Sequence, residues 1–274
     1  MKKPILGIAI FILILLCVYP FGVLFYKIIF SGPNDSFTLK SFDQVLHSAT
    51  TLRAIKNTLM VSLSVSALSA LIGVPLAWLL SRTDFPASRK FRSWLCLSYA
   101  IPPYIGAIAW IFLANPTTGL LNKIFGLNLN IYSFGGLVWV EASFLYTFIL
   151  LTVHASLERM DSSFEEAARL SGASPLKIFK DITLPLIRPA LLGSSLLVFL
   201  ATAASFGVPA LIGSPARIYL ITTQIYTFQK MGSLSGLYKA GALSMFLLLF
   251  AVITLIIQQK ILNKSQFKTV SGKT

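Results

Sequence analysis

The chain has 274 residues, of which 55% are hydrophobic and only 12% are charged, and its mean hydropathy is +0.78. A soluble globular domain carries about 25% charged residues, so the composition excludes the soluble classes and favours a bilayer as the solvent. The formal net charge of +14 would suit a nucleic-acid partner, but Lys and Arg gather at the ends of apolar segments, as membrane topology requires.

Six apolar segments are long enough to cross about 30 Å of hydrocarbon as helices. Backbone groups in lipid must be satisfied within the segment, and the alternating pattern of a barrel is absent, so helices are predicted. No small-residue cleavage site follows the basic start MKK, which indicates an uncleaved first span. The predicted fold is an all-α membrane protein with a single transmembrane domain over residues 1–274. The spans are expected at about residues 5–30, 58–81, 94–113, 134–154, 190–212 and 238–262.

Orientation follows from the distribution of Lys and Arg. With the N-terminus inside, fifteen of the 23 Lys and Arg residues face the cytoplasm, which predicts that both termini and the loop 155–188 are cytoplasmic. Outside, residues 31–57 are expected to hold a short surface helix. Residues 213–237 mix apolar and polar side chains and are expected to dip partly into the membrane.

Several spans contain residues that interrupt helices, including Pro102 and Pro103 in the third span and Gly207 and Pro209 in the fifth. Neighbouring helices can satisfy the backbone groups that such residues free, in packed bundles and in pathway linings alike. These four residues are candidates for the pathway, and ordinary kinks are the alternative. Glu141 is the only acid deep inside a span, and it either lines the pathway or bonds to a neighbouring helix.

Residue types that carry enzyme chemistry are not spaced for it. His47 and His154 fall on opposite sides of the membrane, so they cannot form a metal pair. No Ser/His/Asp or Cys/His set is spaced for nucleophilic attack. The C-terminal letters SGKT resemble the end of a phosphate-binding loop, but Phe267 stands where that loop needs a glycine. No catalytic, metal or cofactor residues are therefore predicted, and the chain is not expected to bind ATP.

The predicted cytoplasmic loop is the most charged stretch, SSFEEAARLSGASPLKIFKDITLPLIRP at residues 162–189. Ser162 and Ser163 each precede a glutamate by three residues, which is the capping-box spacing at a helix start. Glu165 and Arg169 are spaced for an i,i+4 ion pair. Gly172 is expected to end this first helix in a left-handed turn.

A second helix is expected to follow the glycine turn at once. Pro175 suits the first helical position, where its missing N–H does no harm. The pair Leu184 and Pro185 is expected to end the second helix, and Pro189 is expected to begin the fifth span. The predicted product is a polar helical hairpin that leads back into the membrane.

Three interpretations of this hairpin compete. It can dock on a cytoplasmic protein partner and pass on its movement, it can bind DNA as a helix-turn-helix, or it can simply pack on the spans. Ala168, Gly172 and Ile178 match helix-turn-helix positions, but the loop has no third helix, and Glu165 and Glu166 would repel phosphate. The docking interpretation is favoured, and no nucleic-acid partner is expected.

The segment EAARLSGASPLKIFKDITLP, Glu166 to Pro185, resembles the EAA loop of permease subunits from binding-protein-dependent ABC importers. That loop reads E-A-A, three residues, G, nine residues, I-x-L-P. The matching positions are Glu166, Ala167, Ala168, Gly172, Ile182, Leu184 and Pro185. The likeness covers essentially the whole chain, and it implies the six-span type I (MetI-like) importer fold with cytoplasmic termini.

The resemblance also implies partners and roles. Residues 164–171 would be a coupling helix in a cleft of a dimeric cytoplasmic ABC ATPase, which hydrolyses the ATP, so the chain itself would not be an enzyme. A second permease half, identical or homologous, and an extracytoplasmic solute-binding protein would complete the importer in a bacterial inner membrane. The residues assigned to ATPase coupling are Phe164, Glu165, Glu166, Ala167, Ala168, Arg169, Gly172, Ala173, Pro175, Ile182, Leu184 and Pro185.

The cargo is suggested by a second resemblance. Residues 204–226, ASFGVPALIGSPARIYLITTQIY, resemble permeases of the iron(III), thiamine, polyamine and phosphonate group, with ferric-iron members closest. The basic tail ending in VSGK resembles the junction between the halves of tandem-duplicated ferric permeases. Ferric iron is the expected cargo, with thiamine, polyamine and phosphonate as alternatives. An ion-coupled secondary transporter is the alternative of another class, but it calls for several coupled acids at mid-membrane.

Overall fold

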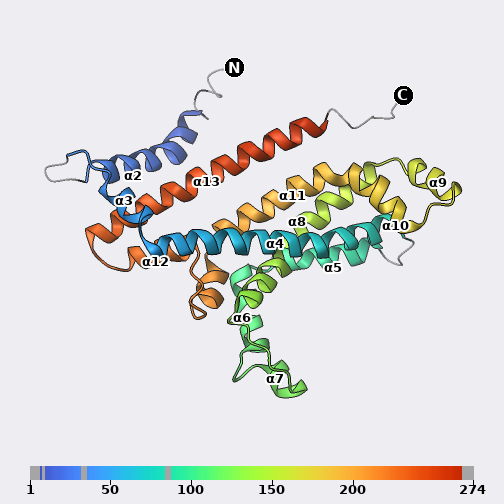
Figure 1. Ribbon diagram of the computed structural model, residues 1–274, viewed down its shortest axis with the longest axis horizontal. Coiled ribbons are helices and arrows are strands. Elements are labelled where there is room, and N and C mark those ends of the chain that lie inside the picture. The colour runs from blue at the N-terminus through green and yellow to red at the C-terminus, as the bar shows by residue number, and fades with distance from the viewer. Residues whose placement is uncertain (1–6, 8–9, 32–35, 84–87, 267–274) are drawn as a thin grey trace.

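The computed structural model describes residues 7, 10–31, 36–83 and 88–266, and every regular element in these ranges is helical (Figure 1). The letter η marks π-helical turns. The elements are η1 Ile14–Val18, α2 Tyr19–Ile29, α3 Lys40–Leu46, α4 Ala49–Arg82, α5 Ser88–Ala100, α6 Pro103–Ala114, α7 Leu120–Phe125, α8 Phe134–Arg159, α9 Ser163–Leu170, α10 Pro175–Ile178, η3 Phe179–Thr183, α11 Leu184–Ala204, η4 Pro209–Gly213, α12 Ile221–Gln229 and α13 Leu234–Gln266.

The main core lies where α4, α8 and α11 pack together along their lengths (Figure 1). Their facing side chains are fully buried, because each helix turns an apolar stripe toward the other two. The buried set includes Val61, Val65, Ala77, Leu137, Val140, Ile149, Leu150, Val153, Leu157, Ile187 and Val198. A second, smaller core joins α2, α3, α12 and α13 around Ile28, Val45, Ile221, Phe228 and Leu243.

Polar side chains also join the long helices. Ser66 donates from its hydroxyl to the Ser195 carbonyl at 2.9 Å, which links α4 to α11. Gln258 donates from Nε2 to the Gly193 carbonyl at 3.0 Å, which links α13 to α11. Where lipid replaces water, such hydrogen bonds and close packing hold helices together, since apolar burial between helices no longer drives association.

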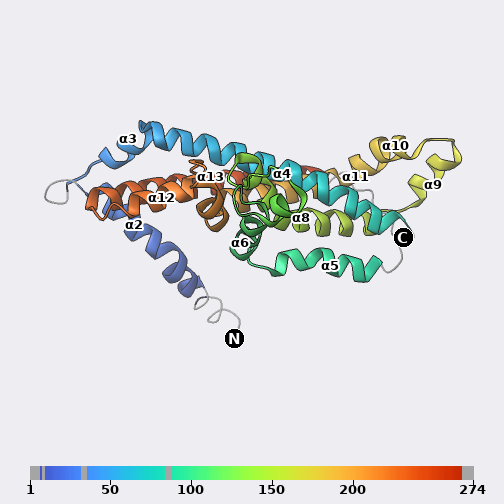
Figure 2. The same cartoon turned by 90° about the horizontal axis from the view of Figure 1, so that it is seen from below.

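Five helical segments of the described residues are long and apolar enough to cross a membrane. They are Ile10–Ile29, Ala49–Arg82, Phe134–Arg159, Pro175–Ala204 and Leu234–Lys260. The predicted third span, 94–113, is not one helix: α5 ends at Ala100, and Pro103 begins α6 after a bend at Ile101 and Pro102. Figure 2 shows α5 running beside the bundle, and Figure 1 shows α6 leaving it at an angle.

The predicted end of the second hairpin helix at Leu184 and Pro185 is also wrong. Pro175 to Ala204 is one continuous helical rod, in which Pro185 and Pro189 both lie. The π turn η3 ends at Thr183, two residues before Pro185, and its wider i→i+5 spacing accommodates a residue that cannot donate the usual i→i−4 bond. The rod then stops at Ser205, inside the predicted span 190–212, and chain direction changes before η4.

Candidate functional site

A two-helix hairpin, α9 and α10, stands at one end of the bundle beyond the ends of α4 and α8 (Figures 1 and 2). Gly172 follows α9 with φ of +81°. Its N–H donates to the Arg169 carbonyl at 2.9 Å, and the Ala173 N–H donates to the Ala168 carbonyl at 3.0 Å, which is the bond pair of a Schellman motif. The predicted glycine turn is confirmed, as is the start of the next helix at Pro175.

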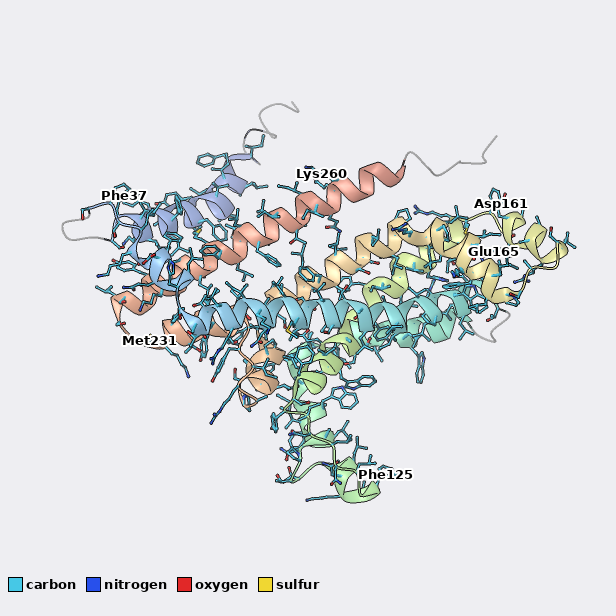
Figure 3. All side chains as sticks on the ribbon, in the orientation of Figure 1. Phe37, Phe125, Asp161, Glu165, Met231 and Lys260 are labelled. Atoms are coloured by element: carbon cyan, nitrogen blue, oxygen red, sulfur yellow. The ribbon has the colours of Figure 1, made fainter. Side chains whose placement is uncertain are left out.

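The start of α9 is held by an acid rather than by the predicted serine capping box. Ser163 donates its N–H to Asp161 Oδ1 at 2.9 Å. The bonds from the Ser163 backbone and then from its hydroxyl lower the pKa of Asp161, because they favour the charged carboxylate. Figure 3 shows Asp161 at the hairpin end of the molecule. The capping function therefore lies one residue before the serines that the spacing indicated.

Glu165 points inward and is only 4% exposed. Its Oε2 lies 2.6 Å from Nε of Arg82, the last residue of α4, and the Thr183 hydroxyl donates to its Oε1 at 2.5 Å. Arg82 donates from Nη2 to the Leu157 carbonyl at 3.0 Å. The predicted pairing of Glu165 with Arg169 is therefore wrong, since the carboxylate instead connects α9 to α4 and η3.

The Arg82–Glu165 contact is an ion pair in a shielded place. The Nε–H is not aligned on Oε2 as a hydrogen bond, so charge attraction and the surrounding bonds hold the pair. The two side chains are 13% and 6% exposed. Removing one partner of such a buried pair would leave an uncompensated charge, at a cost of about 3–5 kcal/mol.

A polar cavity of about 380 Å³ opens between α9 and the end of α4. Its lining consists of Ser81, Arg82, Thr83, Ser162, Glu165, Glu166 and Arg169. Charged and hydroxyl groups dominate this lining, so the cavity suits polar groups rather than an apolar side chain.

A second polar cluster lies beside this cavity at the ends of α4, α5 and α8. His154 is 6% exposed, and its Nδ1 lies 2.5 Å from the Ser81 hydroxyl. Its Nε2 lies 2.8 Å from Arg92 Nη1 and 3.2 Å from Glu158 Oε1. The hairpin therefore rests on a base in which three helix ends are cross-linked by polar contacts.

Three large apolar side chains are exposed on the hairpin, among exposed charged residues that include Glu166, Arg169 and Lys177. Phe164 is 55% exposed, Leu170 is 91% exposed and Leu176 is 76% exposed. Large exposed apolar side chains that are grouped on one projection mark a surface for a partner. In this hairpin they come from both helices.

The predicted coupling residues divide into two groups. Those on the exposed surface are Phe164, Glu166, Ala167, Arg169, Gly172, Pro175 and Pro185. Those turned toward the bundle or the other hairpin helix, and buried or half-buried, are Glu165, Ala168, Ala173, Ile182 and Leu184. Sequence reasoning missed Arg82 and Thr183, and the only signal for Arg82 was a cation at the end of a long apolar segment.

The predicted pathway residues lie near the break that follows α11 and the bend that precedes α6. Glu141, in α8, is 2% exposed and lies beside the Ser205 hydroxyl at the end of α11. Its Oε1 has no hydrogen-bond partner among the described residues. Each of the two interpretations of Glu141 has one observation in its favour. The contact with Ser205 agrees with a bond to a neighbouring element, and the unpaired Oε1 agrees with a place in the pathway.

The helix breaks themselves are packed against each other. A Cβ on Gly207 would lie 3.3 Å from the Tyr104 Cβ, so the α11–η4 connection approaches α6 closely. Pro209 is buried, whereas Pro102 and Pro103 are exposed at the start of α6. Within the described residues, no three or more His, Cys, Asp or Glu side chains are grouped to hold a metal ion.

The sequence of this chain matches the profile of a known protein family. The sequence profile of the family described as "Binding-protein-dependent transport system inner membrane component" matches residues 69–265. The ferric transport system permease protein FbpB of Actinobacillus pleuropneumoniae is 27% identical over 280 residues, which cover 99% of this chain and 40% of that protein. This chain thus spans about two fifths of the length of that relative.

Two further proteins are similar to this chain, one in sequence and one in fold. The 2-aminoethylphosphonate transport system permease protein PhnU of Salmonella typhi is 27% identical over 228 residues, which cover 78% of this chain and 79% of that protein. The fold is shared with a chain of a bacterial ABC transporter for import of the acidic polysaccharide alginate, at a TM-score of 0.75 and 21% identity over 98% of this chain and 96% of that one.

Proposed function

The chain belongs to the family of binding-protein-dependent transport system inner membrane components, and from this premise we propose that it is the permease subunit of an ATP-driven importer. The observation that carries the proposal is the hairpin. It projects beyond the long helices, exposes Phe164, Leu170 and Leu176, and is joined to α4 through a buried ion pair. A short helix with these properties can dock in a groove of a partner and pass on its movement.

The proposed partner at the hairpin is an ABC ATPase dimer on the cytoplasmic side. ATP binding and hydrolysis would close and separate its two subunits, and the hairpin would follow the subunit on which it docks. Because Pro175 to Ala204 is one rigid helical rod, movement at the hairpin reaches the break at Ser205. That break lies beside Glu141 and α6, where the pathway residues are proposed.

The rest of the importer is proposed from the same premise. A second permease half, identical or homologous, completes the pathway, and an extracytoplasmic solute-binding protein delivers cargo to the face opposite the hairpin. The chain is a multi-pass membrane protein, and its proposed location is the bacterial inner membrane with both termini in the cytoplasm. ATP is hydrolysed by the partner, so the chain itself is not an enzyme.

Ferric iron is the proposed cargo. A relative named as a ferric transport permease matches nearly the whole chain, in agreement with the resemblance of residues 204–226. A phosphonate is the second candidate, because a relative named for 2-aminoethylphosphonate matches most of the chain. Chemically the two cargoes are a hard trivalent cation and an oxyanion, so an uptake assay separates them.

We test the permease role by purifying the tagged chain from membranes of its own host. We expect an ATP-hydrolysing subunit to co-purify with the wild type. Glu166→Lys reverses a charge on the exposed docking surface, and Gly172→Pro removes the turn N–H and imposes a φ near −65°. Both variants should insert normally but lose at least about tenfold in bound ATPase or in ATP-driven uptake, which corresponds to about 1.4 kcal/mol.

Asp43→Lys is the matched control, because it makes a similar charge reversal on α3, at the opposite end of the molecule, where Asp43 is exposed. Vesicles that contain the whole complex are then given radiolabelled ferric iron or 2-aminoethylphosphonate with ATP inside. Normal ATPase binding and uptake in both hairpin variants would contradict the permease role. Uptake of the phosphonate alone would retain that role and reject iron.

A further inference from the structure

We propose that Arg82, Glu165 and Thr183 form a clasp that makes the hairpin and α4 move as one rigid body. The name clasp is used for these three side chains together with the Leu157 carbonyl that Arg82 also contacts. The inference rests on the proposed function, since it concerns how movement at the hairpin enters the bundle. Arg82 and Thr183 act as positioning residues, because neither belongs to the exposed docking surface.

The burial pattern of α9 shows why a clasp is needed. Of the eight residues of α9, all of which the structure describes, only Glu165 is buried. An isolated helix of this length is not stable in water, and Phe164 and Leu170 face outward. The one buried side chain of the helix is therefore a carboxylate, and its counter-charge comes from α4.

Both oxygens of that carboxylate are used, and they connect different elements. Oε2 faces Arg82 of α4, and Oε1 accepts from Thr183 of η3. Thr183 is fully buried and lies in the π turn that leads directly into α11. One carboxylate thus fixes α9 against α4 and against the π turn that leads into α11.

The chemistry of the clasp suits a joint that must not slide. Apolar contacts are non-directional, so two apolar faces can shift against each other at small cost. Here the Arg82 side chain is oriented by its bond to the Leu157 carbonyl and the Glu165 carboxylate by its bond from Thr183, and displacement would expose an unpaired buried charge. The clasp therefore specifies the position of α9 relative to α4, as well as holding it.

The test measures whether the hairpin moves relative to α4 when the ATPase closes. Spin labels are placed at Leu71→Cys on α4, which is 71% exposed, and at Lys177→Cys on α10, with Cys17 and Cys96 replaced by Ser. The distance between the labels is measured in the complete complex, without nucleotide and with ATP plus vanadate. With the clasp intact, we expect the same distance in both states.

In Arg82→Gln and Glu165→Gln the ATPase should shift the hairpin, together with the rod that begins at α10, relative to α4. We expect the distance to shift between the two states by about 2 Å or more, the scale of helix shifts in switching proteins. Arg82→Lys keeps the positive charge, so the distance between the labels should again be nearly the same in both states. Arg53→Gln alters an exposed arginine at the other end of the same helix and should behave as the wild type.

Thr183→Val keeps the ion pair and the side-chain volume, so it decides the matter if Arg82→Gln fails to assemble; we expect a smaller but measurable shift. A distance that shifts in the wild type, or stays constant in every clasp variant that assembles, overturns the proposal. Failure of any ATPase to co-purify with the wild type would instead reject the proposed function. The clasp would then be tested by the width of the distance distribution in the permease alone, where equal widths in wild type and Arg82→Gln overturn it.

Discussion

Gly73 shows how a single residue sets the closeness of two long helices. It lies in the last third of α4, and a Cβ at this position would be 3.0 Å from both the Leu150 nitrogen and the Tyr146 oxygen of α8. These are backbone atoms, which cannot move aside as the end of a side chain can. Close approach of backbones through small residues is a principal source of helix association in membranes.

We predict that Gly73→Ala destabilises the protein by about 1–3 kcal/mol, the usual cost of overfilling a packed contact. Gly22→Ala in α2 is the matched control, since no heavy atom of the described residues lies within 4 Å of its Cβ position. There the better helix propensity of alanine should leave stability unchanged or raise it slightly. Thermal unfolding in detergent compares the two, and equal midpoints would contradict the α4–α8 contact.

Glu165 and Asp161 show that neighbouring acids can have different roles. The carboxylate of Glu165 is buried between elements, whereas that of Asp161 is exposed and serves the first turn of α9. Sequence spacing alone treats both as surface acids at a helix start, where the helix dipole favours them. Only the positions of α4 and η3 distinguish them.

At the scale of elements, three π turns accompany proline residues. The turn η1 ends two residues before Pro20, η3 ends two residues before Pro185, and η4 begins with Pro209. A π turn shifts the hydrogen-bond register by one residue, so a chain can pass a proline without a break. The helix therefore continues through Leu184 and Pro185, where an end was expected. This continuity connects the hairpin directly to α11.

The hairpin depends on its capped start, and we predict that Asp161→Ala loosens α9. Amides of residues 163–170 should exchange hydrogen severalfold faster after correction for intrinsic rates, while Asp161→Asn, which keeps an acceptor oxygen, should exchange nearly as the wild type. Unchanged exchange in Asp161→Ala would show that the acid is not the cap.

The hydrogen bond from the Ser163 N–H to Asp161 also predicts that amide exchange in α9 depends on pH. The pKa of Asp161 is lowered in the folded protein, so the stabilisation is complete above the ordinary aspartate pKa. It is lost as the pH falls through the lowered value, because the protonated group is a weaker acceptor. Asp161→Asn should abolish this part of the pH dependence of amide exchange.

At the scale of the whole molecule, the two ends differ in construction. One end carries α3, α12 and the turn at Met231, and the opposite end carries the hairpin with Asp161 and Glu165 (Figure 3). The long helices connect these ends, and α4 alone, with 34 residues, is about 51 Å long. It therefore extends beyond a hydrocarbon core of about 30 Å, and Arg82 is placed at its end where the clasp forms.

We predict that the two ends lie on opposite sides of the membrane. In a background with Cys17 and Cys96 replaced by Ser, Met231→Cys should react with a membrane-impermeant maleimide added outside intact spheroplasts. Leu170→Cys should react only in inverted vesicles, and there more slowly once the ATPase is bound. Both residues are exposed, at 56% and 91%. Labelling of Leu170→Cys from outside would reverse the proposed orientation.

The sequence by itself determined the helical membrane class, the glycine turn at Gly172 and the helix start at Pro175. These features depend on local composition and backbone freedom, which are properties of short stretches of chain. The tertiary structure decided that Glu165 binds Arg82, that Pro185 lies inside a rod, and that the third apolar segment bends at Pro102. Each of these depends on which distant groups can compensate a buried charge or a missing N–H, and only the packing of the helices supplies those groups.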